Sequence, residues 1–132
     1  MNRIRVLLAD DHEAMLERVA SLLKTECDVV GTATDGQQAL EAAQDLKPDV
    51  LVLDISMPVM NGIETAHQLK KAGVETHIVF LTVHDDPDFA REALEAGALG
   101  YVIKPRIASD LVAAIKAAYA GRLFLSPSLP PL

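Results

Sequence analysis

Short apolar runs alternate with segments of helical periodicity five times along the chain. The runs end at polar or turn-forming residues, which is typical of strands buried in a parallel sheet. They lie near residues 4–9, 28–33, 50–53, 77–82 and 100–103. Apolar residues then recur every three or four positions after each run, which predicts five amphipathic helices. Strict alternation predicts an α/β fold: a single five-stranded parallel sheet with five helices on both faces and right-handed crossovers.

Glycine and proline residues mark the ends of the predicted helices. Gly73, Gly97 and Gly121 follow the third, fourth and fifth helical patterns, where helix-terminating glycines are expected. Pro48 stops the second helix, and Pro87 opens the fourth near its first turn. These punctuation residues agree with the boundaries that the apolar pattern predicts.

The repeating pattern stops after residue 121. Residues 122–132 hold three of the seven prolines, so we expect one folded domain over residues 1–121 and a Pro-rich tail or truncated linker over 122–132. The strand near 28–33 is the most polar of the five, which predicts that it lies at an edge of the sheet.

Composition and charge restrict the function. The net charge is −7 and the basic residues form no run, which argues against nucleic-acid binding by this chain itself. The single cysteine, Cys27, excludes an intramolecular disulfide and fits a reducing compartment. No apolar stretch approaches the roughly 20 residues of a membrane span, and the N-terminus lacks a secretory leader. We therefore expect a cytoplasmic protein that does not enter a membrane.

Carboxylates follow two of the predicted strands. Asp54 comes directly after the run 50–53, and Asp10 and Asp11 follow the run 4–9. If these strands are neighbours, three carboxylates project into the crevice where open α/β sheets bind ligands. Carboxylates 4 Å apart repel by about 4 kcal/mol at an effective dielectric of about 20, so a cation must join them. Hard oxygen ligands with open positions indicate Mg²⁺.

Two more strand ends complete a site for phosphoryl transfer. Thr82 ends the fourth strand and Lys104 follows the fifth. Phosphoryl transfer to a protein needs a carboxylate nucleophile, a divalent cation and donors for the phosphoryl oxygens. We predict Asp54 as the nucleophile, with Thr82 and Lys104 holding the transferred group.

The predicted Mg²⁺ ligands come from both carboxylate-bearing strand ends. Asp11, Asp54 and the backbone carbonyl of Ser56 would bind the ion directly, and Asp10 would contribute through water or outer-shell contacts. Taken alone, Asp10 and Asp11 fit equally well as caps of the helix that starts near His12, because Asp is a favoured N-cap. The two roles are compatible.

Four segments together resemble the receiver domain of two-component response regulators. They are residues 8–12, 53–62, 81–82 and 100–105, in the same order and at the same spacing. The resemblance covers residues 3–121. Finer features resemble the branch whose receivers precede a LuxR-type helix-turn-helix domain; they lie at residues 9–12, 84–87 and 121–127.

The resemblance implies a flavodoxin-like strand order, 2-1-3-4-5, and a signalling switch rather than an enzyme with a turnover substrate. A histidine kinase or phosphotransfer protein would phosphorylate Asp54. Thr82 and Tyr101 would couple phosphorylation to the surface: the hydroxyl turns toward the phosphoryl oxygen, and the aromatic ring moves inward. From its position alone, Tyr101 fits a half-buried strand aromatic equally well. Family members often have a cis peptide bond at the site matching Lys104 and Pro105.

Three residues depart from the commonest pattern of this family or occupy its variable positions. Val83 follows Thr82 where a small residue is usual, and its branched side chain would narrow access to the phosphoryl site. Ser56 and His84 stand at the two variable positions that border that site. His84 is placed to hydrogen-bond an attacking water and so to speed dephosphorylation.

Other functions fit the sequence less well. A dehalogenase-type phosphatase needs a second acid two residues after its nucleophile, where this chain has Ser56. A stand-alone or non-phosphorylated interaction module remains the alternative. We favour the regulatory domain of a transcriptional regulator, with DNA bound by a C-terminal domain outside this chain. The Ala-rich segment 111–120 would permit close helix approach in a homodimer.

Overall fold

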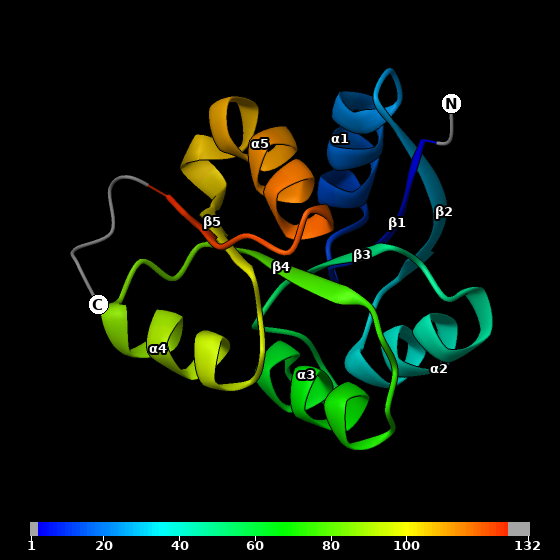
Figure 1. Ribbon diagram of the computed structural model, residues 1–132, viewed down its shortest axis with the longest axis vertical. Helices are drawn as coiled ribbons and strands as arrows, with labels where there is room; N and C mark the ends of the chain where they lie inside the picture. Colours follow the sequence, from blue (N-terminus) through cyan, green and yellow to red (C-terminus); the bar gives the residue numbers. More distant parts are fainter. Residues whose placement is uncertain (1–2, 127–132) are drawn as a thin grey trace.

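The computed structural model describes residues 3–126 and shows one sheet between two layers of helices (Figure 1). All neighbouring strands are parallel, in the order β2-β1-β3-β4-β5-β6. The strands are β1 (Ile4–Ala9), β2 (Cys27–Ala33), β3 (Val50–Leu53), β4 (His77–Thr82), β5 (Gly100–Ile103) and β6 (Phe124–Leu125). The predicted α/β class and the first five strands are confirmed, and β2 lies at an edge as expected.

The predicted number of five strands is wrong, because β6 extends the sheet beyond β5. Gly100 pairs with Phe124 and Tyr101 with Leu125 in parallel register. Two residues are too few to show any periodicity, so the apolar pattern could not reveal this strand. The greater part of the predicted tail, residues 127–132, lies outside the described residues, and the domain boundary at residue 121 remains a prediction.

The helices occupy both faces of the sheet, with α1 and α5 on one side and α2, α3 and α4 on the other (Figure 1). They are α1 (Glu13–Leu23), α2 (Gly36–Leu46), α3 (Gly62–Lys71), α4 (Pro87–Glu95) and α5 (Ile107–Tyr119). Asp35, Asn61 and Asp86 each accept a hydrogen bond from a backbone N–H in the first turn of α2, α3 and α4. The glycines predicted to terminate α3, α4 and α5 have φ angles of 73°, 97° and 76°, which glycine adopts without strain.

Alternate strand residues build two separate cores. One core packs the strands against α2, α3 and α4, and its largest strand members are Leu7, Leu51, Leu53, Phe80 and Tyr101. The other packs the opposite sheet face against α1 and α5 through Leu8, Val52, Val79, Leu81 and Val102. Because both sheet faces are covered, the interior strands are apolar throughout, and polar chemistry is confined to their ends. Among residues 3–126, none of the helices has the length and apolar composition needed to cross a bilayer.

Candidate functional site

The register of β1 and β3 brings two buried aspartates together. Ala9 pairs with Leu53, so Asp10 and Asp54 are the next residues beyond two neighbouring strands. The Asp54 N–H donates to the Ala9 carbonyl at 3.0 Å, which continues the ladder past the end of β3. Each aspartate is only 4% exposed. The sequence-based prediction that these carboxylates share one edge of the sheet is met.

Lys104 provides the positive charge between these carboxylates. Its Nζ lies 2.8 Å from Asp10 Oδ2 and 3.0 Å from Asp54 Oδ2. Burial by itself would lower the pKa of Lys104, but hydrogen bonds to Asp10 and Asp54 and the charges of both outweigh it and raise that pKa. The ammonium is therefore fixed beside the predicted nucleophile. The peptide bond from Lys104 to Pro105 is trans, whereas members of the family often have a cis bond at this site.

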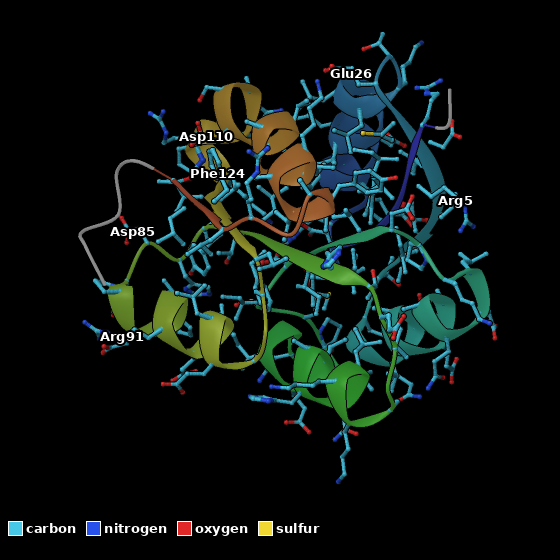
Figure 2. The ribbon with its side chains drawn as sticks, viewed as in Figure 1. Arg5, Glu26, Asp85, Arg91, Asp110 and Phe124 are labelled. Carbon is cyan, nitrogen blue, oxygen red and sulfur yellow. The ribbon has the colours of Figure 1, made fainter. Side chains whose placement is uncertain are left out.

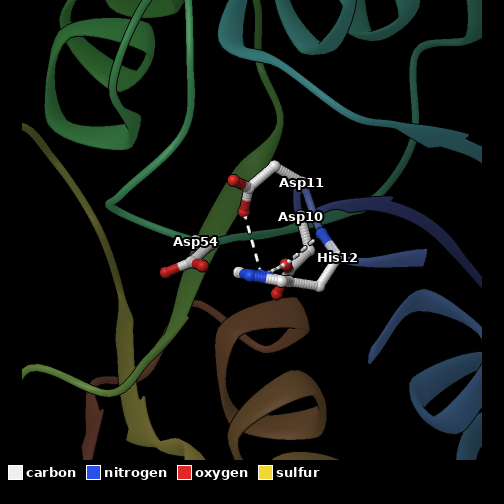
Figure 3. Close-up of side chains that lie close together, drawn as sticks. All are labelled: Asp10, Asp11, His12 and Asp54. Carbon is white, nitrogen blue, oxygen red and sulfur yellow. Dashed lines mark hydrogen bonds and ion pairs between the residues drawn. The ribbon is translucent and has the colours of Figure 1, made fainter. Parts of the chain in front are cut away.

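Asp11 and His12 complete a group of potential metal ligands with Asp10 and Asp54 (Figure 3). One ligand atom from each of the four residues lies within 4.8 Å of the others. Ligands about 2.1 Å from a shared Mg²⁺ lie up to about 4.2 Å apart, so a small contraction would seat the ion. The donor set therefore fits a divalent cation.

Sequence reasoning did not foresee the part that His12 takes in this group. Its Nδ1 lies 3.1 Å from Asp11 Oδ1 and 3.2 Å from Asp10 Oδ1. The His12 N–H also donates to Asp10 Oδ1 at 2.9 Å, while His12 itself occupies the N-cap position of α1. Asp10 thus stabilises the turn that leads into α1 and still faces the pocket. In the sequence, the only signal for this role was that His12 directly follows Asp10 and Asp11.

Thr82 ends β4 at the same edge of the sheet. It is fully buried and pairs with Ile103, the residue before Lys104. Its Oγ1 accepts a hydrogen bond from the His84 N–H at 3.3 Å. The hydroxyl is therefore engaged by the loop after β4 and lies one register position from the lysine strand end.

Tyr101 is fully buried, deeper than the half-buried strand aromatic that was one of the two interpretations of its position. The residue is 0% exposed, and its hydroxyl donates to the His84 carbonyl at 2.7 Å. Burial, with smaller contributions from nearby aspartates, raises the pKa of Tyr101 above its ordinary value. The ring is thus already buried in this structure, where its hydroxyl holds the β4–α4 loop, so the inward movement that the resemblance implies is not needed to reach this position.

His84 connects the two loops that border the pocket. Its Nε2 lies 2.7 Å from Ser56 Oγ, and its ring stacks on Phe89 with centroids 4.4 Å apart. Both polar residues were expected to border the phosphoryl site, but the hydrogen bond between them was not foreseen. Val83, by contrast, is 65% exposed, and the narrowing of access by its side chain stays a prediction.

A close backbone approach shapes the β3–α3 loop beneath the predicted nucleophile. A Cβ on Gly62 would lie 2.1 Å from the Asp54 carbonyl oxygen, so only glycine fits there. The Gly62 N–H donates to the Ile55 carbonyl at 2.7 Å, which closes the loop. Gly62 therefore has the packing and turn role expected from the sequence.

Comparison with known proteins agrees with this geometry. The profile of the response regulator receiver domain matches residues 6–116. The chain belongs to this family. It is therefore a receiver domain of two-component response regulators, whose members are signalling proteins rather than classical enzymes.

Transcriptional regulators are among the similar proteins. The regulatory protein LnrK of Bacillus subtilis is 38% identical over 128 residues, which cover 96% of this chain and 58% of LnrK. The nitrate/nitrite response regulator NarL of Escherichia coli K12 is 38% identical over 129 residues, 96% of this chain and 60% of NarL. This chain thus spans about 60% of the length of these curated relatives.

Solved receiver domains share the fold. The receiver domain of a NarL response regulator from Mycobacterium tuberculosis superposes with a TM-score of 0.88 at 33% identity, covering 92% of this chain and 100% of that one. A LuxR-family response regulator from Aurantimonas gives 0.92 at 34% identity, covering 97% and 93%. These relatives confirm the resemblance to the LuxR-linked branch and do not favour the alternative functions.

Proposed function

We propose that Asp54 accepts a phosphoryl group from a phosphohistidine on a histidine kinase or phosphotransfer protein, in a reaction that uses Mg²⁺. The observation that carries this proposal is the bridge from Lys104 to Asp54 and Asp10 inside a group of potential metal ligands. An ordinary structural ion pair would not need two further ligand side chains, Asp11 and His12, at the same edge.

The chain's own residues have separate tasks in this reaction. A carboxylate oxygen of Asp54 attacks the phosphorus, the phosphorus–nitrogen bond breaks, and the imidazole leaves with the electron pair. Lys104 then donates to a phosphoryl oxygen, and Thr82 turns its hydroxyl to a second one. The Asp54 oxygen held by the Ile55 N–H at 2.7 Å keeps the carboxylate oriented during the attack.

Mg²⁺ would be held by Asp11, Asp54 and the backbone carbonyl of Ser56, with Asp10 contributing through water or outer-shell contacts, and when bound it would neutralise charge on the phosphoryl oxygens. Hard carboxylate oxygens in this number support magnesium over softer metals. The same residues repel one another without a cation, so a bound ion would add to the charge of Lys104 in offsetting that repulsion.

Thr82 and Tyr101 form the proposed switch. The Thr82 hydroxyl now accepts from the loop after β4, and Tyr101 holds the same loop through the His84 carbonyl. Turning Thr82 toward a phosphoryl oxygen would break the first contact and leave the second, so the loop and α4 would settle in a new position. This is a two-state element biased by a local change in charge.

The whole protein is proposed to be a cytoplasmic transcriptional regulator. Similar proteins named as regulators are longer than the matched region, which supports a further domain in the whole protein. We propose that this domain follows the receiver domain and binds DNA. The chain itself carries a net charge of −7, so DNA contact would come through that further domain. Homodimerisation through the Ala-rich α5 would be one route from phosphorylation to altered DNA affinity.

Binding of a phosphoryl mimic tests the pocket. Fluorine NMR with beryllofluoride and Mg²⁺ should show resonances of the bound mimic that disappear when Mg²⁺ is removed. Asp54→Asn should abolish them, because the mimic bonds to the carboxylate oxygen, while Asp49→Asn at the opposite end of β3 should not. Binding that persists in Asp54→Asn would contradict the proposal.

A further inference from the structure

Residues 124–126, here named the C-terminal strap, are bonded along the free edge of β5. Two strap N–H groups donate to carbonyls on this edge, at 2.8 and 2.9 Å, and the second acceptor is the carbonyl of Tyr101. Ser126 is 1% exposed, and its Oγ accepts from the Ile103 N–H at 3.2 Å. The strap therefore satisfies backbone groups of the strand that carries Tyr101 and leads into Lys104.

A buried carboxylate on α5 holds the strap in place. Ser126 Oγ donates to Asp110 Oδ2 at 3.0 Å, and Asp110 is 4% exposed. Figure 2 labels Asp110 on α5. Arg106 grips the same carboxylate through Nε at 2.8 Å and Nη2 at 3.3 Å, and Ser109 adds a bond of 3.1 Å. Burial would raise the pKa of Asp110, but these hydrogen bonds from Arg106, Ser126 and Ser109 lower it. Asp110 is thus an ionised carboxylate that binds both the strap and Arg106, and the strap, Asp110 and Arg106 are together called the clamp.

A single short helix joins this clamp to the phosphoryl pocket. The 3₁₀-helix η1 (Lys104–Arg106) begins at the lysine that bonds Asp54 and ends at the arginine that bonds Asp110. The two cationic groups are therefore separated by one residue, Pro105, whose ring restricts its backbone. A movement of the Lys104 backbone would therefore also move the backbone of Arg106.

We propose that phosphorylation of Asp54 releases the C-terminal strap from β5, so that the route of the chain out of the domain depends on the state of the pocket. This inference rests on the proposed function. When Lys104 leaves the Asp54 carboxylate for a phosphoryl oxygen, the adjacent Ile103 moves with it. The bond from the Ile103 N–H to Ser126 Oγ joins the strap to the residue next to Lys104, so this is the strap contact that the movement disturbs.

Thermodynamic linkage gives the proposal a reciprocal consequence. If occupation of the pocket weakens the strap, then weakening the strap must raise the affinity of the pocket by the same factor. Ser126→Ala removes both side-chain bonds of the strap and touches no residue of the pocket. This variant should bind beryllofluoride with Mg²⁺ at least about fivefold more tightly than the parent chain.

Amide hydrogen exchange, followed by NMR on the 132-residue chain, tests the release directly. Adding Mg²⁺ and beryllofluoride should speed exchange at the N–H groups of Phe124 and Ser126. The N–H of Val52, in the centre of the sheet, serves as the reference and should not change. Unchanged or slower exchange in the strap would overturn the proposal.

Matched variants separate this proposal from the one on which it rests. Ser21→Ala, at an exposed position of α1, should leave beryllofluoride affinity unchanged, whereas Ser126→Ala and Asp110→Asn should both raise it. If the mimic binds but the strap variants match Ser21→Ala, the strap has no coupling and the phosphoryl-acceptor function stands. If the mimic fails to bind the parent chain, the proposed function fails and the inference falls with it.

Discussion

The ammonium of Lys104 offsets the charge of the two buried carboxylates of the acidic pocket. Its side chain is 11% exposed and lies within 3.0 Å of both Asp10 and Asp54. Two buried carboxylates this close would repel without it, since little water reaches them. The same ammonium already donates to Asp54 Oδ2, so it is placed to donate to a phosphoryl group on Asp54 as well.

Replacing Lys104 with Met should lower the free energy of unfolding by about 3 kcal/mol at neutral pH, because both carboxylates remain buried without their partner. The pKa of Lys104 is raised above 10.5 in the folded protein. Its stabilising contribution is therefore complete below pH 10.5 and lost as the pH rises through the folded pKa. Urea unfolding should show a gap between variant and parent that narrows above that pH. Lys71→Met, exposed at the end of α3, should show no such gap.

His84 is the residue through which the loop after β4 meets the pocket. Its backbone N–H donates a hydrogen bond to the Thr82 hydroxyl, and its carbonyl accepts one from the Tyr101 hydroxyl. Its ring is hydrogen-bonded to Ser56. If the ring orients an attacking water, His84→Ala should slow decay of phosphorylated Asp54 by about tenfold, less than a full general base contributes. Loss of the phosphoryl mass with time measures this. The exposed His67→Ala is the control, and equal decay in both variants would remove the role.

At the scale of elements, the β3–α3 loop depends on backbone contact rather than on side chains. Gly62, the first residue of α3, lies so close to the Asp54 carbonyl that a methyl group would overlap it at 2.1 Å. Gly73, after the same helix, has a φ of 73° but open space around it. A substitution at Gly62 therefore tests the cost of steric overlap, and one at Gly73 tests the cost of backbone strain.

Gly62→Ala should cost about 3 kcal/mol or more of unfolding free energy, since the overlap can be relieved only by moving the backbone. It should also weaken beryllofluoride binding, because that movement displaces Asp54. Gly73→Ala should cost only about 1–2 kcal/mol, the strain of the left-handed conformation, and leave binding intact. Chemical denaturation and the fluorine NMR titration give both quantities. A smaller cost for Gly62→Ala than for Gly73→Ala would refute this account of the loop.

At the scale of the whole molecule, the sheet is continued by chain that follows α5. Leu125 packs against the core beneath α4, and Phe124 packs against the core beneath α5. A chain ending at residue 122 should therefore be less stable than one ending at residue 126, by about 2 kcal/mol for two half-buried side chains. Its bare β5 edge should also promote association. Equal unfolding midpoints for the two truncations would show that the strap adds no stability.

The site was largely predictable because a parallel sheet aligns the carboxyl ends of its strands. Once the apolar runs are recognised, Asp10, Asp54, Thr82 and Lys104 must gather at one edge, whatever the loops do. The sheet does not fix which residues of neighbouring loops contact one another in the same way. The pairing of Ser56 with His84 joins residues 28 apart in the chain and depends on side-chain rotamers that no pattern encodes.

The strap escaped prediction for a related reason. A strand of two residues has no measurable periodicity, and the bond from Ser126 to Asp110 follows from how α5 lies over the sheet edge. The inward ring of Tyr101 is likewise a choice between rotamers that the sequence leaves open. Sequence thus specified where chemistry gathers, and the structure added how the surrounding loops connect to it.

Intact mass after incubation with acetyl phosphate tests the central claim most directly. With Mg²⁺ present, the chain should gain the mass of one phosphoryl group, and the gain should require both Mg²⁺ and Asp54. Asp54→Ala should gain nothing, while Asp49→Ala should behave like the parent chain. An adduct that forms equally on Asp54→Ala, or no adduct on the parent chain under any condition, would contradict the account of Asp54 as the phosphoryl acceptor.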